Sequence, residues 1–234
     1  MKMRWVLLPL AALMVASIVC AGVTRSSITD YTAQENWQEY FQVGEIPEEL
    51  WETNCALMKE YLPQAPYILR VEVLGDLEIM HGINQQKVKV THIYAGEGIG
   101  EGQEFYLYAD GWRVVVRSVK SIERNFINIL EVGREYLVFL EKKMEILDSP
   151  LPVYSCYDEV WDTSNGSGEK VCDFYVSPIF SYDYKENVAI QPSTDTNTYV
   201  PYTQVKDNEF FGTTQKSIGL WEQLKAEMLQ RYPR

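Results

Sequence analysis

The sequence has few of the residues on which common enzyme chemistry depends. Its 234 residues include only two histidines and four cysteines, and no C-x-x-C spacing of the kind that holds structural zinc. It also contains no G-x-S-x-G, no H-E-x-x-H, no P-loop and no Rossmann fingerprint. These absences argue against the recognisable serine hydrolases, zinc proteases and nucleotide-dependent enzymes. They favour a protein that is not an enzyme and carries no cofactor.

Basic residues are also in deficit, with 21 lysines and arginines against 33 acidic residues and a net charge of -12. Such a chain repels the phosphates of nucleic acids, so a nucleic-acid partner is not expected. Hydrophobic residues make up 46% of the chain and aromatic residues 13%, which is enough for a packed core. The composition therefore predicts a folded acidic domain.

The N-terminal segment, residues 1–23, begins with the basic residues Lys2 and Arg4 and then runs from Trp5 to Val23 without a charge. One interpretation is a signal peptide that is cleaved before Gly22. Another is an N-terminal membrane anchor, because the apolar stretch is just long enough to cross a bilayer. Lipid attachment at Cys20 is a third. All three place the chain from Thr24 onward outside the cytoplasm, either secreted or attached to the cell membrane by this segment.

Residues 24–66 predict an N-terminal helical brace. Pro47 followed by two glutamates is a helix start signal, and Pro63 ends the predicted helix. Its apolar residues recur at helical spacing and are Trp51, Cys55, Met58 and Leu62. We expect Cys55 to be a small buried residue, since a catalytic thiol would need a histidine partner.

Residues 67–142 contain a series of short segments in which apolar and polar residues alternate, as they do in half-buried strands. Phe105 and Leu107, for example, alternate with Glu104, Tyr106 and Tyr108. The segment from Tyr136 to Leu140 is apolar on both faces, which predicts a central strand. Glycine-containing turns separate the segments and no long helix intervenes, so antiparallel hairpins are expected. The predicted fold is mainly β with flanking helices (α+β), built on an OB-like antiparallel β-barrel core at 67–142.

Three motifs in this core carry a resemblance to a known family: V-K-V-x-x-I-Y-A-G-E at 88–97, G-Q-E-F-Y-L-Y at 102–108 and L-E-V-G-R-E-Y-L-V-F-L at 130–140. The core resembles the netrin-like OB-fold domains of tissue inhibitors of metalloproteinases and their bacterial relatives. The resemblance implies inhibition of an extracellular metalloprotease, in which a mature N-terminal cysteine binds the enzyme's zinc. Cys20 takes that place only if cleavage follows Val19, and the family's disulfide partners for it are not evident.

Residues 143–215 predict a hairpin and an irregular β extension packed on the barrel, and residues 216–234 a C-terminal helix. Cys156 and Cys172 flank the turn-rich segment 163–168, which predicts a hairpin closed by a disulfide between them. The oxygen-rich segment 162–169 is either an ordinary turn or a calcium site. It departs from the EF-hand pattern, which favours the turn. The C-terminal helix has an apolar stripe that contains Trp221 and Leu224.

The most suggestive surface comprises Tyr106, Tyr108 and Trp112, of which the two tyrosines face away from Phe105 and Leu107. Exposed aromatic side chains on a barrel can stack on sugars or bind peptides. The alternative is that the flanking helices cover these side chains. A zinc site that uses His81 and His92 is a further alternative, although their spacing does not demand one. The sequence thus favours a non-catalytic extracytoplasmic binding domain with a protein or carbohydrate partner. The other hypotheses are a metalloprotease inhibitor and an acid-base hydrolase with converging carboxylates.

Overall fold

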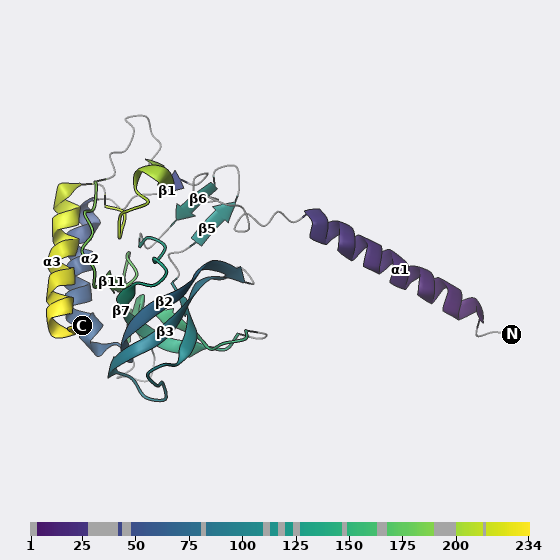
Figure 1. Cartoon of the computed structure of the whole chain (residues 1–234), viewed down its shortest axis with the longest axis horizontal. Coiled ribbons are helices and arrows are strands. Elements are labelled where there is room, and N and C mark those ends of the chain that lie inside the picture. Colours follow the sequence, from purple (N-terminus) through teal and green to yellow (C-terminus); the bar gives the residue numbers. More distant parts are fainter. Residues whose placement is uncertain are drawn as a thin grey trace. The chain divides into compact units, whose positions relative to one another are not determined.

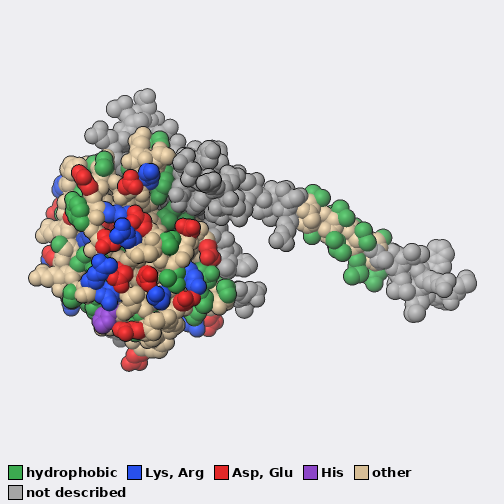
Figure 2. Space-filling view, viewed as in Figure 1, with side chains coloured by type: hydrophobic (Ala, Val, Ile, Leu, Met, Phe, Trp, Pro, Cys, Tyr) green, Lys and Arg blue, Asp and Glu red, His purple; other side chains and the backbone are tan. Residues whose placement is uncertain are grey.

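The computed structural model describes most of the chain. It covers residues 4–27, 42–43, 48–80, 83–109, 113–116, 120–123, 127–146, 149–162, 168–189, 200–212 and 214–234. The chain divides into two compact units, residues 1–37 and residues 38–234. The first unit contains the helix α1, Arg4–Ser27. Its described apolar side chains are exposed, for example Ile18 at 70% (Figure 2). Among the described residues, no helix meets the length and hydropathy needed to cross a membrane.

The second unit is built on a closed barrel of five strands (Figure 1). The strands are β2 (Tyr67–Met80), β3 (Ile83–Ala95), β4 (Glu104–Tyr108), β7 (Glu135–Met144) and β8 (Val153–Cys156). They pair in the order β7-β2-β3-β4-β8, and a further pairing of β8 with β7 closes the ring. All pairs are antiparallel except β4 with β8, which is parallel. If the five barrel strands are numbered by their order along the chain, their order around the barrel is 1-2-3-5-4-1, which is that of an OB-like barrel. The predicted mainly β fold with flanking helices is therefore confirmed.

The barrel's limits differ from the predicted range of 67–142 in two respects. The fifth strand, β8, lies beyond residue 142, and it pairs with both β4 and β7. The segment β5 (Arg113–Val116) is not a barrel strand. It pairs with β6 (Lys120–Glu123) in a small separate sheet that also holds β1 (Gln42–Val43) and β12 (Val200–Pro201).

The barrel interior is formed by the side chains that the sequence alternation places on one face. Leu69 of β2 lies opposite Val138 of β7, and Val88 of β3 lies opposite Phe105 of β4. All four side chains are fully buried. The strand β7 is buried on both faces, because a second row containing Phe139 faces the helices. The prediction that Tyr136 to Leu140 form a central strand is therefore confirmed.

Two helices cover the outer face of β7 and of β11 (Ile179–Ser181), which extends the sheet beside it. They are α2 (Glu48–Tyr61) and α3 (Gln215–Arg231), and Figure 1 shows them side by side. Their contact with the sheet is aromatic: the ring of Trp221 stacks on Phe180 of β11 at 4.9 Å and meets Trp51 edge-on at 6.1 Å. The short 3-10 helix η2 (Leu62–Gln64) follows α2. Cys55, on α2, is 8% exposed.

A buried ion pair also fixes α3 to the domain. Lys225 of α3 donates a hydrogen bond to the carboxylate of Glu209, and the exposed fractions of their side chains are 7% and 3%. The second oxygen of Glu209 accepts a hydrogen bond from the Ser181 amide of β11 at 2.6 Å. Because burial favours the neutral acid, the pKa of Glu209 is raised, although Lys225 opposes the shift. Both carboxylate oxygens are therefore engaged in holding the fold together.

The predicted disulfide between Cys156 and Cys172 is wrong, because both residues are free thiols in the structure. The expected hairpin does form, from β9 (Glu159–Asp162) and β10 (Glu169–Asp173). Cys172 lies on it opposite Val160, whereas Cys156 precedes it on β8, opposite Leu140 in the barrel. The two cysteines thus belong to different sheets rather than to two arms of one hairpin.

Candidate functional site

Of the three aromatic residues singled out from the sequence, the structure describes Tyr106 and Tyr108. Tyr106 is only 6% exposed, because it lies between Lys87 of β3 and Val153 of β8 on neighbouring strands. Burial and nearby Glu78 raise the pKa of its hydroxyl. Tyr108 is half-buried, and Trp112 lies outside the described residues. A binding role for these side chains remains a prediction.

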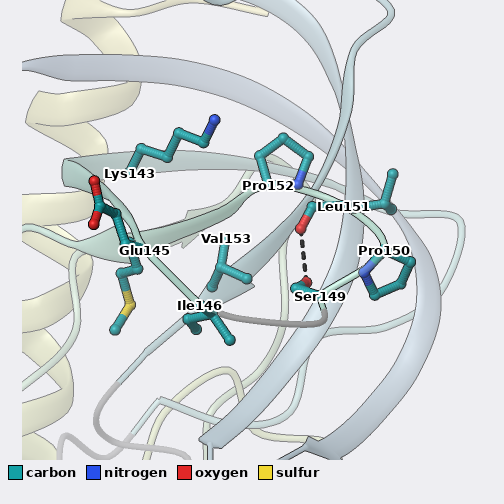
Figure 3. A pocket seen from close by; sticks show the side chains of 9 residues that line it. Lys143, Glu145, Ile146, Ser149, Pro150, Leu151, Pro152 and Val153 are labelled. Carbon is teal, nitrogen blue, oxygen red and sulfur yellow. Dashed lines mark hydrogen bonds between the residues drawn. The ribbon is translucent and has the colours of Figure 1, made fainter.

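Two residues that pair with Tyr106, Pro152 and Val153, line a hollow that the sequence does not predict. The loop between β7 and β8 encloses a shallow hollow of about 410 Å³, which we call the β7–β8 hollow. Its lining comprises Lys143, Met144, Glu145, Ile146, Ser149, Pro150, Leu151, Pro152 and Val153. Figure 3 shows Lys143 and Glu145 on one side, the segment from Ser149 to Pro152 on the other, and Ile146 and Val153 between them.

The wall of this hollow is held by hydrogen bonds and by proline. The hydroxyl of Ser149 donates to the carbonyl oxygen of Leu151 at 2.7 Å (Figure 3). The amide of Tyr106 donates to the carbonyl oxygen of Pro152 at 2.8 Å, which ties the loop to β4. Pro150 and Pro152 each have a restricted φ. These constraints lower the entropy that the loop would lose when a ligand binds.

The hollow has apolar residues at its centre, polar surface around them and two charges at its edge. Ile146 and Leu151 are half-buried, and Val153 is only 1% exposed. Lys143 and Glu145 are exposed and form no ion pair with any described residue. A surface of this kind suits the apolar side chain of a ligand surrounded by polar contacts.

The residues considered for metal binding lie elsewhere. His92 hydrogen-bonds through Nδ1 to the carboxylate of Glu101 at 3.0 Å, and His81 lies outside the described residues. Within the described ranges, no three His, Cys, Asp or Glu side chains come close enough together to hold a metal ion. Most of the proposed calcium segment, residues 163–167, is likewise outside the described part.

The hydrolase hypothesis requires two carboxylates with raised pKa values in one pocket. Burial raises the pKa of the described residue Glu209, but both of its oxygens are occupied by Ser181 and Lys225. Over the face shown in Figure 2, acidic and basic side chains are interspersed rather than gathered in a patch of one sign.

Fold and hollow together define an OB-like barrel with an apolar hollow at one interstrand loop. The chain matches no protein-family model, and no curated protein is significantly similar to it in sequence. One signal in the sequence, the Pro150-Leu151-Pro152 run, marks one wall of the hollow, although it does not reveal the hollow itself.

Proposed function

We propose that this protein is a non-catalytic binding domain that acts outside the cytoplasm and docks a partner protein at the β7–β8 hollow. The observation that carries the proposal is the position of the hollow on the barrel. In OB-folds, ligands contact the second and third strands and the loops that join strands one and two and strands four and five. The β7–β8 loop joins the fourth and fifth barrel strands, and two residues that line its hollow, Pro152 and Val153, pair with Tyr106 on the third.

A protein partner fits the chemistry of the hollow better than a carbohydrate does. Sugars are held by exposed aromatic faces, whereas the described lining of the β7–β8 hollow includes aliphatic residues and two prolines but no aromatic ring. A volume of about 410 Å³ suits one or two apolar side chains that anchor a larger interface. The charged side chains of Lys143 and Glu145 lie at the edge of the hollow, where they can orient the partner through polar contacts around the apolar anchor.

The extracytoplasmic location rests on the basic start and the uncharged run of residues 1–23. The netrin-like resemblance remains a proposal about ancestry. The inhibitor and hydrolase hypotheses remain predictions that no feature of the described residues favours. Attachment through the N-terminal segment is compatible with the binding role, because the barrel belongs to the second unit of the chain.

Site-specific photocross-linking in the source cell tests the proposal. A photoreactive phenylalanine analogue replaces Leu151 in the full-length chain. In a matched control it replaces Val188, which is 56% exposed and does not line the hollow. We expect a discrete protein adduct from position 151 and none from position 188. The adduct should disappear when Ile146→Asp places a charge in the hollow.

The other outcomes overturn parts of the proposal. Equal adducts from both positions would show that the hollow is not the interface. A second outcome is that position 151 gives no protein adduct, while an immobilised glycan retains the wild-type chain and does not retain the Ile146→Asp variant. That result would show that the partner is a carbohydrate and not a protein. No adduct and no retention would remove the hollow as a binding site.

A further inference from the structure

A second hollow lies where three separate segments of the chain meet. It is formed by the bulge of β2 at Asp76, by the turn at 129–134, and by the 3-10 helix η3 (Tyr202–Gln204) with the residues after it. We call it the β2-bulge hollow. Its volume is about 540 Å³, and its lining comprises Asp76, Ile129, Leu130, Glu131, Val132, Arg134, Tyr202 and Lys206. It shares no lining residue with the β7–β8 hollow.

Two polar side chains from inside the barrel hold one wall of this hollow in place. Gln86 is fully buried, and its side-chain amide accepts from the Leu130 amide at 2.8 Å and donates to the Leu130 carbonyl oxygen at 3.0 Å. It donates a second bond to the Gly75 carbonyl oxygen at 3.2 Å, beside the bulge. The hydroxyl of Tyr136 accepts from the Glu131 amide at 3.0 Å. The bulge and the turn are thereby fixed relative to each other.

A second buried network holds the opposite wall. Asn128 is 3% exposed, and its side-chain amide donates to the carbonyl oxygens of Lys206 at 2.9 Å and Asn208 at 2.6 Å. The hydroxyl of Tyr202 donates to the side-chain oxygen of Asn128 at 2.8 Å, and burial raises the pKa of that hydroxyl to about 12. The tyrosine is therefore a neutral donor at physiological pH. Hydrogen bonds within the chain thus hold both walls without a ligand, which favours a preformed binding site.

The charged side chains of the hollow fall into two groups. Glu131 is engaged, because it pairs with Lys185 and with Arg134 at 3.6 Å, and Arg134 also pairs with Asp183 at 3.2 Å. Asp76 and Lys206 differ, since both are exposed and neither forms a side-chain hydrogen bond or ion pair with any residue that the structure describes. They are also not within ion-pair distance of each other. The hollow thus presents one carboxylate and one ammonium group, at separate points, that have no partner among the described residues.

Apolar surface lies with these two charges. The side chain of Val132 is 52% exposed, and Ile129 is half-buried beside it. We propose that the β2-bulge hollow binds a small zwitterion, a free amino acid or short peptide with an apolar side chain. The ligand carboxylate pairs with Lys206, its ammonium group with Asp76, and its side chain packs on Val132 and Ile129. This inference goes beyond the proposed partner docking, because it assigns a small-molecule site to a different part of the barrel.

The experiment is an NMR titration of the full-length protein with three related probes. L-leucine carries both charges, N-acetyl-leucine only the carboxylate, and leucine amide only the ammonium group. We expect saturable shifts at Asp76, Val132 and Lys206 with leucine, and binding about tenfold weaker or more with each singly charged probe. Lys206→Gln and Asp76→Asn, both surface changes, should each weaken leucine binding by a similar factor. Lys143→Gln, in the other hollow, should leave it unchanged.

Each remaining outcome overturns the inference. Equal binding of N-acetyl-leucine and leucine would make the site a simple anion site. Equal binding of leucine amide and leucine would make it a cation site. No saturable shift with leucine or with leucyl-leucine, or shifts that persist in both surface variants, would show that the hollow binds no zwitterion. Because these probes do not address position 151, the cross-linking result and this one fail independently.

Discussion

Tyr106 of β4 and Val153 of β8 lie opposite each other across the only parallel pair of the barrel. The amide of Tyr106 donates to the carbonyl oxygen of Pro152, the residue before Val153. This pairing joins the third barrel strand to the fifth, and β8 in turn pairs with β7. The relationship therefore both closes the barrel and positions the loop that forms the β7–β8 hollow.

Replacing Gln86 by leucine should destabilise the protein. The change leaves the Leu130 amide and carbonyl without their side-chain partners at 2.8 and 3.0 Å. Leaving buried polar groups unpaired costs about 1–3 kcal/mol of unfolding free energy. Urea unfolding followed by circular dichroism measures the loss. The matched control, Gln223→Leu on the exposed side of α3, should change the unfolding free energy by less than about 0.5 kcal/mol. Equal effects of the two changes would contradict a bracing role for Gln86.

Gly96 should not tolerate alanine. Its φ is +130°, and a Cβ there would lie 2.5 Å from the Tyr67 ring. The strained backbone and the displaced ring together should cost about 1–3 kcal/mol of unfolding free energy. Gly100 is the control, because a Cβ at that position meets nothing within 4 Å. Thermal unfolding of Gly96→Ala and Gly100→Ala compares them directly, and a Gly96→Ala variant as stable as the control would refute the close packing of Tyr67.

The hairpin β9–β10 should respond to acid through Glu159. A hydrogen bond from Lys170 at 3.0 Å, and a weaker one from the Trp161 indole at 3.1 Å, hold the pKa of Glu159 below its ordinary value of 4.5. A carboxyl group whose folded pKa is depressed contributes stability above its unfolded pKa, and that contribution is lost as the pH falls through the folded pKa. The Trp161 indole N–H resonance should therefore move at a pH below 4.5, before the whole protein unfolds.

Glu159→Gln provides the control for this titration, because it retains a side-chain oxygen but has no carboxyl group to titrate. The indole resonance of Trp161 should then show no separate acid transition. A transition that survives the substitution would assign the effect to another group.

The described cysteines should differ sharply in their reactivity. Burial raises the pKa of the Cys55 thiol to about 12 and that of Cys156 well above its ordinary value, whereas Cys172 is half-buried and Cys20 exposed. Since the thiolate is the reactive form, an alkylating agent at neutral pH should modify Cys172 slowly and leave Cys55 and Cys156 intact. Mass spectrometry of the native and the unfolded protein measures this. Formation of a disulfide lowers the mass by two hydrogens. If that loss maps to Cys156 and Cys172, it would contradict the finding that both are free thiols.

Local patterns predicted much of this fold. Alternation located β2, β3, β4 and β7, and the doubly apolar run of β7 correctly indicated a strand buried on both faces. Helical spacing located α2 and α3. The features that the sequence patterns predicted wrongly depend on contacts between distant segments of the chain. Tyr106 has the parity of an outward residue, yet the pairing with β8 that covers it comes from a segment nearly fifty residues later.

The hollows could not be predicted for a related reason. The segment 149–152 shows its prolines in the sequence, but the hollow that it lines depends on the pairing of β8 with two strands at once. In the same way, Gln86 looks like an ordinary polar residue of a strand. Only the packed barrel shows that its side chain holds the turn at Leu130.

The central claim is that the β7–β8 hollow is the partner-binding site of this barrel. The most direct test is the affinity of the cross-linked partner, once purified, for three forms of the full-length protein: wild type, Ile146→Asp, and Val188→Asp. The account predicts that Ile146→Asp weakens binding by about tenfold or more, because it puts a charge into an apolar anchor site, and that Val188→Asp leaves affinity within about twofold of wild type. Equal affinities of the wild type and Ile146→Asp, with both variants folded, would contradict it.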